Sequence, residues 1–206
     1  AILLPAGLSM MVLTPLTGRL ADRINPGVQV SFGLLMFVIS FYLLSFADVR
    51  TTAITLALLT MISRAGMGFI FPALSAGGVR ALPPELLAQG AASMNFTRQL
   101  SGAFGVNLLA VFLEDRTQTY ASRLAATQTP GNAASEQYVA QVSDLALPLG
   151  LSHADAQGVA VHHLSQALHD QAVTMAFQSA YEVGAVVFVF SLIGGVLMAR
   201  GRPHGA

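Results

Sequence analysis

The stretch VQVSFGLLMFVISFYLLSFA, residues 28–47, contains no charged side chain and decides the class of fold. A helix needs about 20 predominantly apolar residues to cross the hydrocarbon core of a bilayer, and this run has that length. Bulky aliphatic and aromatic side chains lie all round the helix that it would form, with little polar content. We therefore predict a membrane-spanning helix that faces lipid at the periphery of a bundle.

Four other stretches on either side have a similar character, and they lie at residues 1–18, 51–79, 86–113 and 174–199. The whole chain agrees with this pattern, because 54% of its 206 residues are hydrophobic and only 10% are charged. Soluble domains carry roughly 25% charged residues. We predict an all-α, polytopic membrane helix bundle with about five transmembrane helices. The first stretch has no basic leader and no small-residue cleavage site, so we interpret it as a span cut at its front rather than a signal peptide.

The expected organisation follows from these spans. Residues 1–113 hold four transmembrane helices with cytoplasmic loops at 18–27 and 80–85, residues 114–172 form an extracytoplasmic loop with amphipathic helices, residues 173–200 form the last span, and residues 201–206 form a cytoplasmic tail. This orientation rests on five arginines on one side against three on the other, since positive loops stay in the cytoplasm.

Several classes of function are disfavoured. The net charge is zero, so no basic surface for nucleic acid is expected. The chain has no cysteine, which removes disulfides and thiolate metal sites, and no enzyme motif such as H-E-x-x-H or G-x-S-x-G is present. We therefore expect no enzyme activity, no catalytic residues and no cofactor.

Charged and polar residues inside the predicted third and fourth spans are the candidates for function. Arg64 has 13 uncharged residues before it and 15 after it, so its side chain cannot easily reach an interface. Burying an arginine there costs at least about 2.5–3.5 kcal/mol, which suggests a use such as binding a partner carboxylate, a substrate anion or a coupled proton site. The transport path candidates are Arg64, Asn95, Arg98 and Gln99. The alternatives are a structural arginine bonded to carbonyls at Arg64, and a side chain at Arg98 that extends to the cytoplasmic interface.

The predicted outer loop contains helical signals and a group of histidines. Tyr138, Val142, Leu145 and Leu149 recur at helical spacing. Ser152 followed by Asp155 resembles a capping box, from which a helix would run into the last span. The histidines at 153, 162, 163 and 169 accompany Asp155 and Asp170, but neighbouring helical residues point about 100° apart. We therefore favour a solvated polar face over a zinc site and expect no metal.

The loop after the first span carries Gly18-x-Leu20-x-Asp22-Arg23, which resembles the G-x-L-x-D-R loop signature of the major facilitator superfamily. Departures from the usual pattern follow it, because the chain continues with Ile24-Asn25-Pro26-Gly27. The later stretches RAGMGFIFPAL (64–74) and NFTRQLSGAFG (95–105), with the long outer loop before the last helix, are similar to the closing part of the fourteen-helix drug:proton antiporters of the EmrB/QacA type.

This resemblance implies a fold and a function. The chain would be the C-terminal portion of a transporter of roughly 500 residues, with Gly18, Asp22 and Arg23 in a cytoplasmic gating loop. It would lie in the bacterial inner membrane and export hydrophobic drugs or toxic compounds, by proton antiport and alternating access. Its partners would be the lipid bilayer, a hydrophobic small-molecule substrate, protons and, by analogy, a periplasmic adaptor protein. The alternative is a truncated, non-transporting membrane fragment or interaction subunit.

Overall fold

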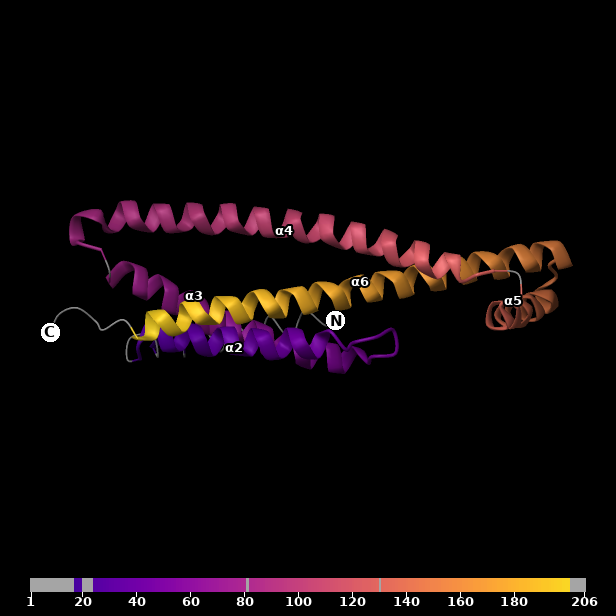
Figure 1. The fold of residues 1–206 in the computed structure, drawn as a ribbon, viewed down its shortest axis with the longest axis horizontal. Coiled ribbons are helices and arrows are strands. Elements are labelled where there is room, and N and C mark those ends of the chain that lie inside the picture. The colour runs from indigo at the N-terminus through magenta and orange to yellow at the C-terminus, as the bar shows by residue number, and fades with distance from the viewer. Residues whose placement is uncertain (1–16, 20–23, 81, 130, 201–206) are drawn as a thin grey trace. The chain divides into compact units, whose positions relative to one another are not determined.

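A computed structural model describes residues 17–19, 24–80, 82–129 and 131–200, and these residues contain helices and no strand. The chain divides into two compact units, the first formed by residues 1–109 and 178–206 and the second by residues 110–177. The long helices are α2 (Pro26–Leu44), α3 (Ala53–Arg80), α4 (Leu87–Ala126), α5 (Ala133–Ala146) and α6 (His153–Arg200), with short 3₁₀ turns η1 (Pro84–Leu86) and η2 (Leu147–Leu149) (Figure 1).

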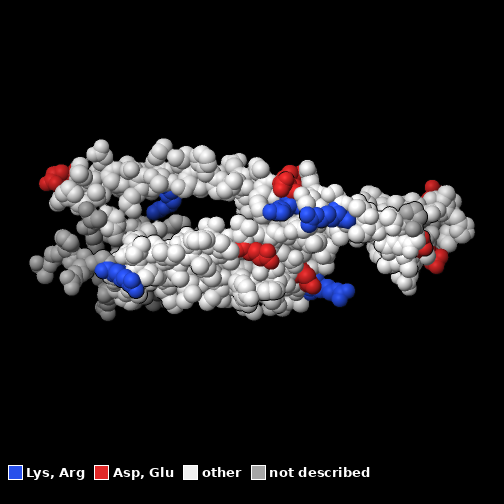
Figure 2. Space-filling view, viewed as in Figure 1, with Lys and Arg blue, Asp and Glu red and all other residues white. Residues whose placement is uncertain are grey.

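Four described helices, α2, α3, α4 and α6, are long and apolar enough to cross a membrane. They contain the predicted second, third, fourth and fifth spans, so the prediction of a helical membrane bundle is confirmed. The predicted first span lies outside the described residues, except for Thr17–Arg19, which are helical. Most of the surface shown in Figure 2 is uncharged, and its charged side chains are few, some of them with opposite charges next to each other.

The core of the first unit forms where α2 packs between α3 and the C-terminal part of α6, which run alongside it in Figure 1. Val30 and Leu34 of α2 are buried together with Ala73 of α3, and Phe188 of α6 packs against them. Aromatic rings extend this contact, because the Phe41 ring lies edge-on to both Tyr181 and Phe188, with centroids 5.3 Å and 5.0 Å away. Such ring pairs stabilise a packed interface beyond the area they bury.

Glycines allow the helices in this core to approach closely. A Cβ atom built on Gly33 of α2 would lie 2.7 Å from the main-chain oxygen of Gly66 in α3. On the α6 side, a Cβ at Gly184 would lie 2.6 Å from the Phe41 ring. In lipid, where water does not drive helices together, such close packing by small residues is a main source of association.

α2 thus has one side that packs against protein and one side that is exposed. α2 buries seven residues within the chain, whereas α4 buries none. The opposite side of α2 remains apolar and exposed, and includes Leu35, Ile39 and Tyr42. The sequence pattern misses this difference because a helix that is apolar all round has no periodicity to separate a lipid-facing side from a protein-facing side.

The second unit contains the last part of α4, from residue 110, and a helical hairpin formed by α5 and the first part of α6. Asn132 begins α5, since its Oδ1 accepts hydrogen bonds from the amides of Ala134 and Ser135. Ser152 and Asp155 begin α6, because Ser152 Oγ donates to Asp155 Oδ2 (2.6 Å) and accepts from the Asp155 amide (3.2 Å). The structure thus forms the N-cap half of the predicted capping box, while the Asp155 carboxylate accepts from the Ser152 hydroxyl instead of its amide. The helix that begins here runs to Arg200, as predicted.

Candidate transport path

Arg98 of α4 is held by two residues of α3. Its Nη2 donates a hydrogen bond to Ser75 Oγ over 3.3 Å, and its guanidinium lies 5.2 Å from the centroid of the Phe71 ring. Both partners are uncharged, so the positive charge is stabilised by a hydroxyl dipole and an aromatic face rather than by a carboxylate. The contact joins two helices in their membrane-crossing segments. The sequence analysis named Arg98 as a path candidate but did not predict this contact with α3.

Arg64 lies on the same face of α3 as the residues that hold Arg98. Phe71 and Ser75 follow Arg64 by seven and eleven positions, which correspond to about two and three helical turns and therefore to nearly the same direction. Arg64 is exposed, and among the described residues it makes no hydrogen bond or ion pair. One face of α3 thus presents a guanidinium group and, about 11–16 Å further along the axis, the two residues that bind a second guanidinium.

Asn95 and Gln99 lie within one turn of Arg98 on α4 and are exposed. Neither side chain makes a hydrogen bond with the part of the chain that the structure describes. α4 also exposes large apolar residues on its other sides, including Phe96, Phe104 and Leu108. The four path candidates therefore lie on two adjacent helices, and the structure brings one of them, Arg98, into contact with the other helix.

Of the predicted gating loop, Gly18 belongs to the short helical segment Thr17–Arg19, whereas Asp22 and Arg23 lie outside the described residues. Next to this segment, Gln29 of α2 is buried, and its Nε2 donates to the main-chain oxygens of Thr17 (3.0 Å) and Phe69 (3.3 Å). Its Oε1 is buried and accepts no hydrogen bond. One side-chain amide therefore joins α2, α3 and the residues before the loop.

The sequence reasoning missed three such amide side chains. Besides Gln29, Asn25 Nδ2 donates to the oxygen of Ala199 over 3.1 Å, and Gln178 Nε2 donates to the oxygen of Ala47 over 2.6 Å. The last two join α2 to α6 at opposite ends. A usable signal was present for Asn25, which precedes Pro26 at a helix start, and for Gln29, which is an amide inside an apolar run.

The histidines of the second unit were considered as metal ligands. In the parts of the chain that are described, no three histidine or acidic side chains come close enough together to hold a metal ion. His153 follows the cap of α6, and His169 lies with Asp170 near Ser165 and Gln166 on the surface.

Comparison with known proteins agrees with the fold. Residues 1–106 match the model of the Major Facilitator Superfamily. The lincomycin resistance protein LmrB of Listeria monocytogenes is 30% identical over 142 residues, which are 69% of this chain and 29% of that protein. The multidrug export protein EmrB of Escherichia coli is 24% identical over 207 residues, 98% of this chain and 38% of that protein.

The multidrug resistance protein B homolog of Mycobacterium tuberculosis is 24% identical over 203 residues, covering 96% of this chain and 35% of that protein. No solved structure matches the chain. The chain thus spans between about a quarter and two fifths of the length of the curated relatives that it matches. The matched residues include α2, α3 and the part of α4 that contains Arg98. We conclude that this chain belongs to the Major Facilitator Superfamily.

Proposed function

We propose that this chain is the C-terminal part of a secondary active transporter that exports hydrophobic drugs or toxic compounds. Export would use proton antiport and alternating access, in which two halves of a bundle expose a central site to each side of the membrane in turn. The similarity to LmrB and EmrB supports the drug class, because those relatives are described as resistance and export proteins.

The contact of Arg98 with Ser75 and Phe71 is the observation that carries this proposal. An arginine inside a membrane span is expensive, and such residues typically face the interior of a bundle or a water-filled cavity. Here the guanidinium lies against α3, and Asn95 and Gln99 flank it on α4. We propose that these residues and Arg64 line the route of the exported compound.

Efflux measurements with alanine variants test this assignment. The longest polypeptide that the gene encodes is expressed in cells that lack their major exporters, and extrusion of a fluorescent hydrophobic dye is followed. Arg98→Ala should lower the initial rate about tenfold at equal membrane abundance, because losing its charge-assisted contact of about 1.5 kcal/mol with Ser75 corresponds to that factor. Arg64→Ala should also lower the rate, because it removes a positive charge from the proposed route. Arg123→Ala, a matched change outside the predicted spans, should leave the rate unchanged. Unaltered efflux in both span variants would remove them from the path.

The location is proposed on the same grounds: the bacterial inner membrane, with the C-terminus in the cytoplasm and residues 114–172 outside. Protons and a periplasmic adaptor protein are the further proposed partners. Fusing a fluorescent protein, which folds in the cytoplasm, after Ala206 tests the orientation. A bright fusion is expected, and a dark fusion that becomes active with a periplasmic reporter would reverse the predicted topology.

A second candidate is a non-transporting membrane fragment or interaction subunit. One observation favours this second candidate for residues 1–206 expressed alone. α4 buries no residue within this chain, so its surface is left without packing partners. Expression of residues 1–206 beside the longest encoded polypeptide separates the two candidates. Efflux from the longer product alone supports the transporter, and efflux from neither supports the second candidate.

A further inference from the structure

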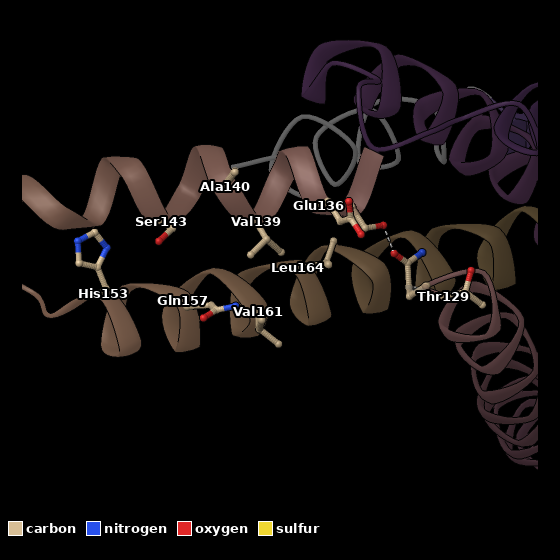
Figure 3. Close-up of a pocket in the computed structure, with 11 residues that line it drawn as sticks. Thr129, Glu136, Val139, Ala140, Ser143, His153, Gln157, Val161 and Leu164 are labelled. Carbon is tan, nitrogen blue, oxygen red and sulfur yellow. Dashed lines mark hydrogen bonds between the residues drawn. The ribbon is translucent and has the colours of Figure 1, made fainter. Parts of the chain in front are cut away.

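A groove runs between α5 and the first part of α6, entirely within the second unit, and has a volume of about 810 Å³. Figure 3 shows side chains of the two helices facing each other across it. On α5 the groove is lined by Glu136, Val139 and Ser143, and on α6 by Gln157, Val161 and Leu164. We call this the α5–α6 groove.

The spacing of these residues explains why they share the groove. Glu136, Val139 and Ser143 lie at helical intervals of three and four, and so do Gln157, Val161 and Leu164. Each helix therefore turns one stripe towards the other. Each stripe combines aliphatic side chains with hydrogen-bonding groups, so the groove is apolar with polar groups along it.

The charge around the groove has one sign. Residues 124–177 contain four carboxylates, at 136, 144, 155 and 170, and no lysine or arginine. Glu136 is the carboxylate that lines the groove, and its Oε1 is fixed by a hydrogen bond from the Gly131 amide over 2.9 Å. Asp155, by contrast, is engaged in the helix cap with Ser152. The groove thus has an oriented negative group in a segment without lysine or arginine, and the imidazole of His153 lines it as well.

We propose that the α5–α6 groove binds a hydrophobic organic cation. Its volume lies in the range of sites for drug-sized ligands, roughly 300–1,000 Å³, and such sites typically pair an apolar lining with a few placed polar groups. Val139, Val161 and Leu164 provide the apolar contact, and Glu136 provides the counter-charge. A bare divalent metal fits poorly, because hard cations need several oxygen ligands and one carboxylate lines the groove. An organic anion is opposed by the negative field of the segment.

The residues of this groove belong to the second unit and those of the candidate transport path to the first, and the proposal does not rest on the proposed function. It therefore needs a readout that reports on the groove itself. The chain contains no cysteine, so a single Ser143→Cys substitution places the only thiol of these 206 residues in the groove. The rate of its alkylation by a maleimide then reports whether the groove is occupied.

The experiment uses the longest polypeptide that the gene encodes, with any cysteine outside these 206 residues replaced by serine, purified in detergent at pH 8. Tetraphenylphosphonium should slow alkylation of the Ser143→Cys variant at least about threefold and saturably, whereas tetraphenylborate, an anion of the same size and shape, should not. Ala134→Cys, on the opposite side of α5, is the matched control and should react at the same rate with and without the cation.

Charge variants identify the counter-charge. Glu136→Gln keeps an oxygen for the Gly131 amide and removes the charge, so the half-protecting concentration of tetraphenylphosphonium should rise about threefold or more. Asp144→Asn removes the same charge from the same helix outside the groove and should change it little. Gln157→Glu adds a carboxylate to the groove and should lower the half-protecting concentration of tetraphenylphosphonium. Equilibrium dialysis can measure the same change in affinity in a variant that has no cysteine in the groove. Equal protection by the borate, or equal effects of Glu136→Gln and Asp144→Asn, overturns the proposal.

Discussion

The Nδ2 atom of Asn25 lies 3.1 Å from the main-chain oxygen of Ala199 and donates a hydrogen bond to it, so that the start of α2 is joined to the end of α6. The same side chain uses its Oδ1 to accept from the Gly27 amide over 2.9 Å, which begins α2. One residue therefore both caps a helix and connects two helices that are far apart in the sequence.

Substitutions at Asn25 should separate these two roles. Asn25→Asp keeps the capping oxygen but loses the donor, and should lower the free energy of unfolding by about 1 kcal/mol. Asn25→Ala loses both and should lower it by about 2 kcal/mol, since an N-cap alone contributes roughly 1 kcal/mol. Denaturant titration of the purified protein in detergent measures both values. Equal stability of the two variants would mean that the capping oxygen contributes nothing, and an Asn25→Asp variant as stable as the original chain would mean that the bond to Ala199 contributes nothing.

The close approach of α2 and α3 should make Gly33 sensitive to a single methyl group. A Cβ at Gly33 would lie 2.7 Å from the Gly66 oxygen, and the backbone would have to move. We expect Gly33→Ala to destabilise the protein by about 1–3 kcal/mol, as overpacking does elsewhere. Gly194→Ala on α6 is the matched control, because nothing lies within 4 Å of its Cβ and alanine favours a helix. Thermal unfolding in detergent compares them, and similar melting temperatures would contradict the packing.

The contact of Arg98 with Ser75 should appear as a coupling energy. Arg98→Ala, Ser75→Ala and the double variant form a cycle whose interaction term we expect to be about 0.5–1.5 kcal/mol in unfolding free energy. Ser101→Ala, on α4 one turn beyond Arg98, is the matched control, because the Ser101 side chain makes no hydrogen bond with the described residues, and it should show additive behaviour with Ser75→Ala. An interaction term near zero for Arg98 and Ser75 would indicate that the hydrogen bond is not formed in the membrane.

The cap of α6 gives a prediction for the second unit. Ser152→Ala removes the hydroxyl that bonds the Asp155 amide and carboxylate, and should lower local stability by about 1 kcal/mol. Hydrogen exchange should therefore become about fivefold faster for amides in the first turns of α6. Ser152→Thr keeps the hydroxyl and should behave like the original chain, so equal acceleration in both variants would refute the cap.

The sequence predicts the helical class, four described spans and the capping box because each depends on local composition or on residues a few positions apart. The lengths of uncharged runs report membrane thickness directly, and Ser152 with Asp155 is a local signal. The central place of α2 was not predictable in this way. It depends on which sides of Gly33, Phe41 and Gly184 meet residues of α3 and α6, and lipid and packed protein favour the same apolar side chains.

The candidate path was predicted in part. An arginine inside an apolar run is conspicuous at positions 64 and 98, but its partners are not. Ser75 and Phe71 are common residue types in a membrane span. They lie on the same face of α3 as Arg64, eleven and seven positions after it, and this face meets Arg98. The stabilising amides of Gln29 and Gln178 were overlooked, because a lone amide gives no periodic signal.

The pairing of α2 with α6 has a consequence for biogenesis. The ring of Phe41 packs on Tyr181 and Phe188, whose codons are translated about 140 codons later. At a translation rate of about 5–20 residues per second, α6 is synthesised on the order of ten seconds after α2. During that interval, lipid or the insertion machinery must cover the aromatic and glycine surface of α2. A product truncated before residue 178 would therefore contain an α2 helix that never packs against α6.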